Sequence, residues 1–234
     1  AYHGIELVGL AVHIGSLLTD LLPCLHAFER TADAFHRIRA MGLPLHRLDL
    51  GGGLGIAYRG ETVPSLDDYV QTVRKATDGL EAELAFEPGR RIVGEAGILV
   101  SKVEYVKQGR DRQFVILDAA MNDLIRPMLY DAWHEMIPLH EPAGTDGQIP
   151  VDVVGPVCES TDTFAKERRL PPLKEGDLIA ICSTGAYGAV MSSTYNSRLL
   201  VPEVMVHGDW HAVIRPRQSF EDLIAQDRVP SWLK

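Results

Sequence analysis

A glycine-rich loop after a predicted strand is the first feature of this sequence that could do chemistry. Gly51, Gly52 and Gly53 directly follow the predicted strand 45–50. Because glycine has no Cβ, backbone amides in such a loop can approach a ligand closely, and converging amides bind anions. The loop therefore predicts a phosphate site, as on the strand-end loops of (β/α)8 barrels. A tight strand-to-helix turn without a ligand would need the same residues, so both interpretations stay open here.

Glu87 places a carboxylate at the end of the next predicted strand, in the segment Glu87-Pro88-Gly89-Arg90. Carboxylates at the carboxyl ends of barrel strands are typical of catalytic sites. A carboxylate that faces a pyridine nitrogen favours the protonated ring, and a pyridinium withdraws electrons from an adjacent carbanion. An exposed ion pair of Glu87 with Arg90 or Arg91 is the alternative, and it would contribute little free energy.

His13 and Ser16 follow the first predicted strand of the sequence. An imidazole at a strand end can stack on a planar ligand, and a serine hydroxyl can donate a hydrogen bond to a phosphate. A histidine with a purely structural contact is the alternative. Each of these first candidates thus follows a predicted strand.

The second half of the chain carries its candidate residues in three short motifs. These are Arg126-Pro127-x-x-Tyr130, Gly155-Pro156-x-Cys158-Glu159-Ser160-x-Asp162 and Gly185-Ala186-Tyr187-Gly188. A guanidinium such as that of Arg126 suits bidentate recognition of a carboxylate. The Cys158 thiol could pass a proton to a reacting carbon that lies nearby. The alternative is a packed cysteine beside a solvated glutamate.

The elements that must position these residues change in character near residue 97. Strand-like runs at 5–13, 45–50 and 84–86 alternate with helical patterns at 25–41 and 69–80. This alternation predicts a parallel α/β architecture for residues 1–97. After residue 97, turn residues separate short β-type runs at 98–100, 103–106, 114–117, 151–154, 178–181 and 199–206. These runs predict a mostly antiparallel β domain, which a helix at 220–226 closes.

Composition excludes several classes of protein. The 23 Lys and Arg against 32 Asp and Glu give a net charge of −9, which disfavours binding along a nucleic-acid backbone. The apolar run 7–14 is far shorter than the roughly 20 residues of a membrane span, so no membrane contact is expected. Three widely spaced cysteines without a C-x-x-C motif argue against a disulfide framework and a zinc site. They predict a reducing compartment, the cytoplasm.

Six motifs occur in one order along the chain. They are His-Ile-Gly-Ser, Leu-Asp-Leu-Gly-Gly-Gly-Leu-Gly, Glu-Pro-Gly-Arg, Ile-Arg-Pro-x-Leu-Tyr, Gly-Pro-x-Cys-Glu-Ser-x-Asp and Gly-Ala-Tyr-Gly. Together they resemble the fold type III, alanine-racemase-like decarboxylases that depend on pyridoxal 5'-phosphate, and within these the diaminopimelate decarboxylase family. The resemblance implies removal of the carboxylate at the D centre of meso-2,6-diaminopimelate, which gives L-lysine and CO₂ in the last step of lysine biosynthesis.

The resemblance also implies a fold and a domain division. Residues 1–97 would be the C-terminal part of a (β/α)8 barrel that binds the cofactor. Residues 98–234 would be a mostly antiparallel β-barrel domain for substrate and dimer contacts. In such enzymes the Cys-Glu segment reaches the site from the partner subunit, so a homodimer with a shared active site is expected.

Individual residue roles follow from the same resemblance. Cys158 would be the catalytic proton donor. Contacts with the cofactor would come from the strand-end loops and one tyrosine, namely His13, Ser16, Gly52, Gly53, Glu87, Gly89, Arg90 and Tyr187. Contacts with the amino-acid substrate would come mainly from the second half, namely Arg90, Arg126, Tyr130, Glu159 and Tyr187.

The lysine that would hold the cofactor as a Schiff base has no counterpart among the lysines of this chain. The chain also starts at Ala1 without Met. We therefore expect a C-terminal portion of a longer enzyme, which is inactive by itself.

Three alternatives remain open. A related decarboxylase of ornithine, arginine, lysine or carboxynorspermidine would share the motifs, although Glu159 beside Cys158 favours a substrate with a charged amino-acid end. A catalytically dead regulator of the same fold would have no chemical need to retain Glu87, Cys158 and Tyr187 together. A phosphate-binding barrel enzyme without the cofactor would leave the Cys-Glu pair unexplained.

Overall fold

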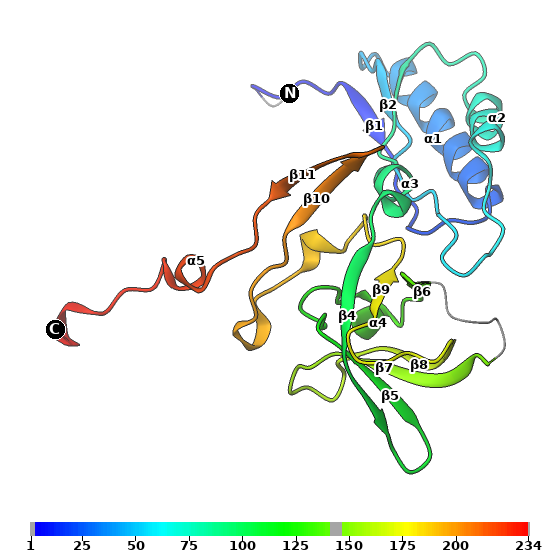
Figure 1. Ribbon diagram of the computed structural model, residues 1–234. Coiled ribbons are helices and arrows are strands. Elements are labelled where there is room, and N and C mark those ends of the chain that lie inside the picture. Colours follow the sequence, from blue (N-terminus) through cyan, green and yellow to red (C-terminus); the bar gives the residue numbers. More distant parts are fainter. Residues whose placement is uncertain (1–2, 141–146, 234) are drawn as a thin grey trace. The chain divides into compact units, whose positions relative to one another are not determined.

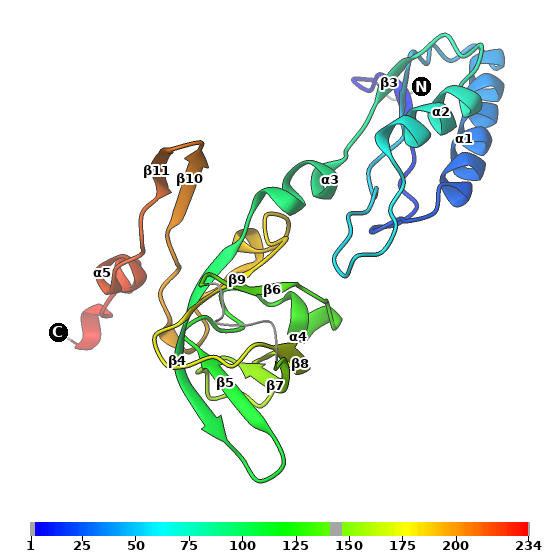
Figure 2. The same ribbon diagram turned by 45° about the vertical axis from the view of Figure 1, so that its right-hand side comes forward.

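The structure is a computed structural model that describes residues 3–140 and 147–233 of the chain (Figure 1). The chain divides between Gly97 and Ile98 into two compact units. The first is built of helices and a small sheet and the second mainly of strands, as Figure 2 shows from another direction.

The first unit is a parallel sheet with connecting helices. Strands β1 (Gly9–Ala11), β2 (Arg47–Asp49) and β3 (Glu83–Ala85) pair in the order β1-β2-β3, both pairs parallel. Helices α1 (Leu22–Ala40) and α2 (Leu66–Ala76) provide the crossovers and bury their apolar faces in one core with the strands. The predicted alternation of strand and helix is confirmed for this unit, with strands shorter than the apolar runs suggested.

Local sequence signals set the bounds of both helices. Helix α1 begins with Pro23 in its first turn, where proline needs no hydrogen-bond acceptor, and it ends before Gly42, whose φ of +86° suits glycine. Ser65 caps α2, because its hydroxyl accepts a hydrogen bond from the amide of Asp68 at 3.0 Å. The helices thus begin and end where their caps place them, and each starts at least three residues before the predicted range.

The second unit contains a six-stranded mixed sheet in the order β6-β9-β4-β5-β7-β8. Its strands are β4 (Leu99–Gln108), β5 (Gln113–Leu117), β6 (Met136–Pro138), β7 (Ile149–Val154), β8 (Thr163–Leu170) and β9 (Leu178–Ile181). Apolar side chains of these strands form one core, centred on Val103, Leu117, Val153 and Ile179.

The predicted β barrel is only partly confirmed. Four strand pairs are antiparallel, but β5 and β7 are parallel, because the connection between them crosses over through α4 (Arg126–Tyr130) and β6. Strands β6 and β8 lie at opposite ends of the strand order, so the sheet is open within the described ranges.

Shorter elements complete the chain. Strands β10 (Glu203–His207) and β11 (Trp210–Arg215) form an antiparallel hairpin, and α5 (Phe220–Ile224) follows at the predicted place. Helix α3 (Gly89–Val93) and four single 3-10 turns, at Gly94–Ala96, Ala189–Met191, Tyr195–Ser197 and Ser231–Leu233, lie between the larger elements. None of the helices in the described part of the chain is both long and apolar enough to cross a membrane.

Candidate functional site

Three loops that follow the parallel strands pack directly against one another, and we call them the strand-end rim (residues 13–18, 51–55 and 87–90). The glycines make this contact possible. A Cβ on Gly51 would lie 2.2 Å from the carbonyl oxygen of Val12, and one on Gly52 would lie 2.0 Å from that of Glu87. Such distances are incompatible with any side chain. The glycines therefore allow close contact between the loops. The sequence by itself did not show that this contact requires glycine.

Backbone hydrogen bonds make the rim rigid. The amide of Glu87 donates to the carbonyl of Gly51 at 2.8 Å, and the amide of Leu18 donates to the carbonyl of Gly53 at 2.8 Å. The Asp49 carboxylate accepts from the amide of Gly51 at 2.8 Å. Within the described part of the chain, the amide of Gly53 has no hydrogen-bond acceptor. The rim thus presents an unused donor at the carboxyl end of the sheet.

His13 lies on this rim with an exposed side chain. Its Nδ1 accepts a long hydrogen bond of 3.4 Å from the amide of Gly52. Because a backbone amide only donates, this contact uses the lone pair of Nδ1. The glycine loop therefore orients the imidazole.

Arg90 brings positive charge to the rim and reaches two other side chains. Its guanidinium donates to the hydroxyl of Tyr58 at 2.6 Å and to that of Ser16 at 3.3 Å, and it lies over the Tyr58 ring at 5.7 Å. Tyr58 is buried. Tyr58 lies between β2 and α2 in a segment without a motif, so its sequence context does not predict this contact. The structure thus joins two predicted residues, Ser16 and Arg90, through direct contact.

Glu87 has its backbone fixed by the rim and its side chain exposed. Its carboxylate makes no hydrogen bond or ion pair with any residue that the structure describes. The ion pair with Arg90 or Arg91, which was the alternative for this residue, is therefore absent from the described structure. Gly89 opens α3 beside it, in open space.

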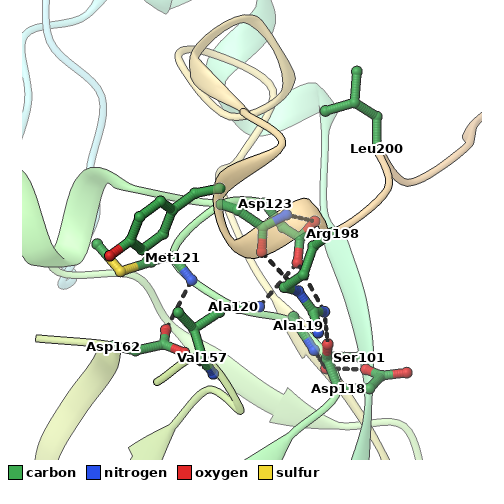
Figure 3. A network of polar contacts seen from close by, with 12 residues as sticks. Ser101, Asp118, Ala119, Ala120, Met121, Asp123, Val157, Asp162, Arg198 and Leu200 are labelled. Atoms are coloured by element: carbon green, nitrogen blue, oxygen red, sulfur yellow. Dashed lines mark hydrogen bonds and ion pairs between the residues drawn. The ribbon is translucent and has the colours of Figure 1, made fainter. Parts of the chain in front are cut away.

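In the second unit, Cys158 lies in the segment 155–162, which we call the Cys158 loop. Asp162 is the last residue of this loop. Its carboxylate accepts one hydrogen bond from the amide of Val157 and one from that of Met121, each 2.8 Å long (Figure 3). Gly155 is packed against the same carboxylate, since a Cβ there would lie 2.2 Å from Oδ2. One buried side chain thus folds the loop and ties it to the segment after β5.

That neighbouring segment, residues 118–123, is itself held by a polar network (Figure 3). The Asp123 carboxylate accepts from the amide of Ala120 at 2.9 Å and lies 3.7 Å from the Arg198 guanidinium. Arg198 also donates to the side chain of Asn122 at 2.8 Å and to the carbonyl of Asp118. Burial raises the pKa of Asp123 and of Asp162, although hydrogen bonds from backbone amides lower it in part.

Cys158 and Glu159 occupy the outer part of the Cys158 loop. Cys158 is exposed and carries a free thiol. The Glu159 carboxylate accepts from the amide and the hydroxyl of Thr161, at 3.2 and 3.1 Å. The loop therefore presents a free thiol beside a carboxylate whose direction is set.

Helix α4 carries Arg126 and Tyr130, which are four residues apart and so lie on one side of it. Arg126 is buried and its Nη1 lies 2.7 Å from Nε2 of His134, whereas Tyr130 is exposed. The sequence analysis missed His134, because it lies outside the helix, beyond Asp131 in left-handed conformation (φ +51°).

Tyr187 is 42 % exposed and adopts φ +59°, a conformation that is strained for an aromatic residue. Gly188 follows it, and a Cβ there would lie 2.3 Å from the carbonyl oxygen of Thr184. Such strain persists only where the surrounding structure enforces it, and it is concentrated at functional sites.

The predicted site residues thus fall into two sets, one in each unit. In the first, the rim gathers His13, Ser16, Gly52, Gly53, Glu87, Gly89 and Arg90. In the second, α4, the Cys158 loop and the turn after β9 carry Arg126, Tyr130, Cys158, Glu159 and Tyr187. Among the described residues, no group of three or more His, Cys, Asp or Glu side chains is placed to hold a metal ion.

Comparisons with known proteins show which family the chain resembles. A family model described as "Pyridoxal-dependent decarboxylase, C-terminal sheet domain" matches residues 16–185. A diaminopimelate decarboxylase from Zymomonas mobilis is 46 % identical over 235 residues, covering 100 % of this chain and 55 % of that protein.

Two solved structures of diaminopimelate decarboxylases complexed with L-lysine are also similar. The protein from Helicobacter pylori matches with a TM-score of 0.89 at 44 % identity, covering 94 % of this chain and 54 % of that one. The protein from M. jannaschii matches with a TM-score of 0.91 at 35 % identity, covering 97 % and 53 %. The chain thus spans about half the length of the relatives that it matches.

Proposed function

This chain belongs to the pyridoxal-dependent decarboxylase family, and from that premise we propose that its protein removes the carboxylate at the D centre of meso-2,6-diaminopimelate to give L-lysine and CO₂. The family model and the identity to curated diaminopimelate decarboxylases support this reaction. The observation in the structure that carries it is the rim, where the Glu87 carboxylate, the His13 imidazole and the unused amide of Gly53 occupy one sheet end.

The residues of the rim fit pyridoxal 5'-phosphate. The Gly53 amide, the Ser16 hydroxyl and the Gly89–Arg90 segment would hold the phosphate, since all are donors or positive. His13 would lie against the pyridine ring, and Glu87 would face the ring nitrogen. The absence of another partner for the Glu87 carboxylate within the described residues supports this role.

The cofactor supplies an electron sink for the pair of electrons that remains on the substrate when CO₂ leaves. Glu87 would favour the protonated pyridine nitrogen of the bound cofactor, because a carboxylate stabilises an adjacent cation. Arg90, Arg126, Tyr130 and Glu159 bind the charged groups of the substrate, and Tyr187 contacts both cofactor and substrate. Cys158 then donates a proton to the carbon that has lost its carboxylate.

The same proposal extends to architecture. Residues 1–97 form the last part of a (β/α)8 barrel, and residues 98–234 form the domain for substrate and dimer contacts. The active unit is a homodimer in the cytoplasm, in which the Cys158 loop enters the partner's site. The exposed thiol of Cys158 supports a loop that enters the partner's site. The three cysteines are free, which supports a reducing compartment.

Decarboxylation assays on the whole protein that carries this chain test the proposal. With pyridoxal phosphate present, meso-diaminopimelate should release CO₂ and yield L-lysine. L-ornithine and L-lysine, each with a single carboxylate, should be turned over at least about a hundredfold more slowly, since they leave a charged binding group unpaired. Preferred turnover of L-ornithine or L-lysine would assign the related decarboxylases instead, and no turnover of any of the three would favour a regulator.

A further inference from the structure

We propose that His134 is a positioning residue, whose neutral imidazole holds the Arg126 guanidinium in the orientation that binds a carboxylate of the substrate. The inference rests on the proposed function for the role of Arg126, and on geometry for the role of His134. Arg126 is 5 % exposed and His134 is 1 % exposed. Nη1 of Arg126 lies 2.7 Å from Nε2 of His134.

The hydrogen-bond partners of the ring determine its protonation. On one side, Nδ1 lies 2.8 Å from the carbonyl oxygen of Cys182, which only accepts, so Nδ1 carries a proton. On the other side, the guanidinium of Arg126 only donates, so Nε2 must offer its lone pair. The ring therefore has one proton and no charge, since a doubly protonated ring would turn an N–H group towards another N–H group.

The main chain around His134 is fixed as well. Its carbonyl accepts a hydrogen bond of 2.7 Å from Arg168 on β8, and the Arg168 guanidinium stacks on the Trp133 ring at 3.4 Å. The amide of Cys182 donates to the carbonyl of Glu135 at 2.8 Å. The imidazole is thus held from β8 and from the end of β9, and it cannot move without disturbing both.

A neutral acceptor suits an arginine that must still bind an anion. An aspartate or glutamate at position 134 would orient the guanidinium equally well, but it would neutralise its charge. The imidazole lone pair orients the guanidinium and leaves its positive charge uncompensated by this contact. His134 therefore fixes the plane of Arg126 through a contact that adds no negative charge beside the guanidinium.

A matched pair of variants separates the two contacts of the ring. In His134→Gln, the side-chain oxygen can replace Nε2 as the acceptor for Arg126, whereas the bond to Cys182 is lost. In His134→Asn, the amide can replace the Nδ1 donor to Cys182, whereas Arg126 loses its acceptor. Both variants of the whole protein, loaded with pyridoxal phosphate, are compared in kinetics, in L-lysine binding by calorimetry and in melting temperature.

If His134 positions Arg126, His134→Asn should raise the KM for meso-diaminopimelate and weaken L-lysine binding by about tenfold or more, with kcat changed less than about threefold. His134→Gln should restore both values to within about threefold of wild type. In an Arg126→Ala background, His134→Asn should cause no further loss, because it acts through Arg126.

Equal effects of the two variants, or additive losses in the Arg126→Ala background, would overturn the proposal. Similar melting temperatures of the two variants ensure that the comparison reports on Arg126 and not on folding. If the wild-type protein binds L-lysine but does not decarboxylate meso-diaminopimelate, the proposed function fails while the binding comparison still decides the role of His134.

Discussion

Among single residues, the buried carboxylates of Asp162 and Asp123 near the Cys158 loop accept hydrogen bonds from backbone amides. Asp162 accepts from Val157 and Met121, and Asp123 accepts from Ala120. Such bonds fix loops without using a cation, although the Arg198 guanidinium lies 3.7 Å from Asp123 and also acts on the charge of Asp162. The two carboxylates therefore act on loop shape, while their burial disfavours the charged form.

The pH dependence of stability should reveal this burial at Asp123. Burial raises its pKa above the ordinary 3.8, although the Ala120 amide and Arg198 act in the opposite direction. The folded protein binds the proton of the Asp123 carboxyl more tightly than the unfolded chain does. The contribution of this group to the unfolding free energy is therefore full below about pH 3.8 and is lost as pH rises through the raised pKa. The unfolding free energy of wild type minus that of Asp123→Asn should therefore fall as pH rises.

Urea unfolding of both proteins at several pH values, from about pH 4 to neutrality, measures that difference. Carboxylates elsewhere titrate alike in the two proteins and cancel. If wild type instead gained unfolding free energy relative to Asp123→Asn as pH rises, the interaction with Arg198 would outweigh burial.

At the scale of elements, the rim depends on glycine where loops touch. Gly52→Ala would place a methyl group 2.0 Å from the carbonyl of Glu87 and push the two loops apart. We expect unfolding free energy to fall by about 1–3 kcal/mol and the affinity for pyridoxal phosphate to fall with it. Fluorescence titration of the cofactor and thermal unfolding measure the two effects.

Gly60→Ala is the matched control for this change. Gly60 has φ +75° but open space around its Cβ position, so alanine there adds backbone strain without a clash. It should reduce stability and leave cofactor affinity within about twofold of wild type. Equal loss of affinity in both variants would mean that the contact between the loops is not what shapes the site.

For the whole molecule, the proposed homodimer makes the two units of different chains interdependent. The β10–β11 hairpin leaves Val206, Trp210 and Val213 exposed at 69, 80 and 62 % in this chain. Apolar surface of this kind is normally covered by another part of an assembly. Cys158 is free and exposed, as the proposed shared site requires.

Mixing two inactive variants tests whether sites are shared between subunits. Glu87→Ala and Cys158→Ala should each abolish most activity alone. When the two variants are co-expressed in equal amounts, about half of the dimers are hybrids, and each has one intact site if Cys158 enters the partner's site. Recovery of about a quarter of wild-type activity is expected from this symmetry. No recovery, with hybrids shown by mass spectrometry, would place Glu87 and Cys158 of one chain in the same site.

The sequence alone determined the parallel strand–helix pattern of the first unit and the β character of the second. Those patterns are local, because buried strands and capped helices require periodic apolar residues and cap residues such as Ser65 and Gly42 in the sequence. Strand β8 escaped prediction because Lys166, Glu167, Arg168 and Arg169 interrupt its apolar pattern. Strand β6, with three residues, is too short to show a period.

The candidate residues of the rim were also visible in the sequence, since each follows a strand, but their contacts were decided only by tertiary structure. The packing of Gly52 on Glu87, the contact of Arg90 with Ser16, and the hydrogen bonds of His134 join residues that belong to different elements. Such contacts leave no periodic signal, because they depend on how the loops meet in space. Residue types can therefore be read from the chain, whereas their protonation, orientation and partners arise from packing.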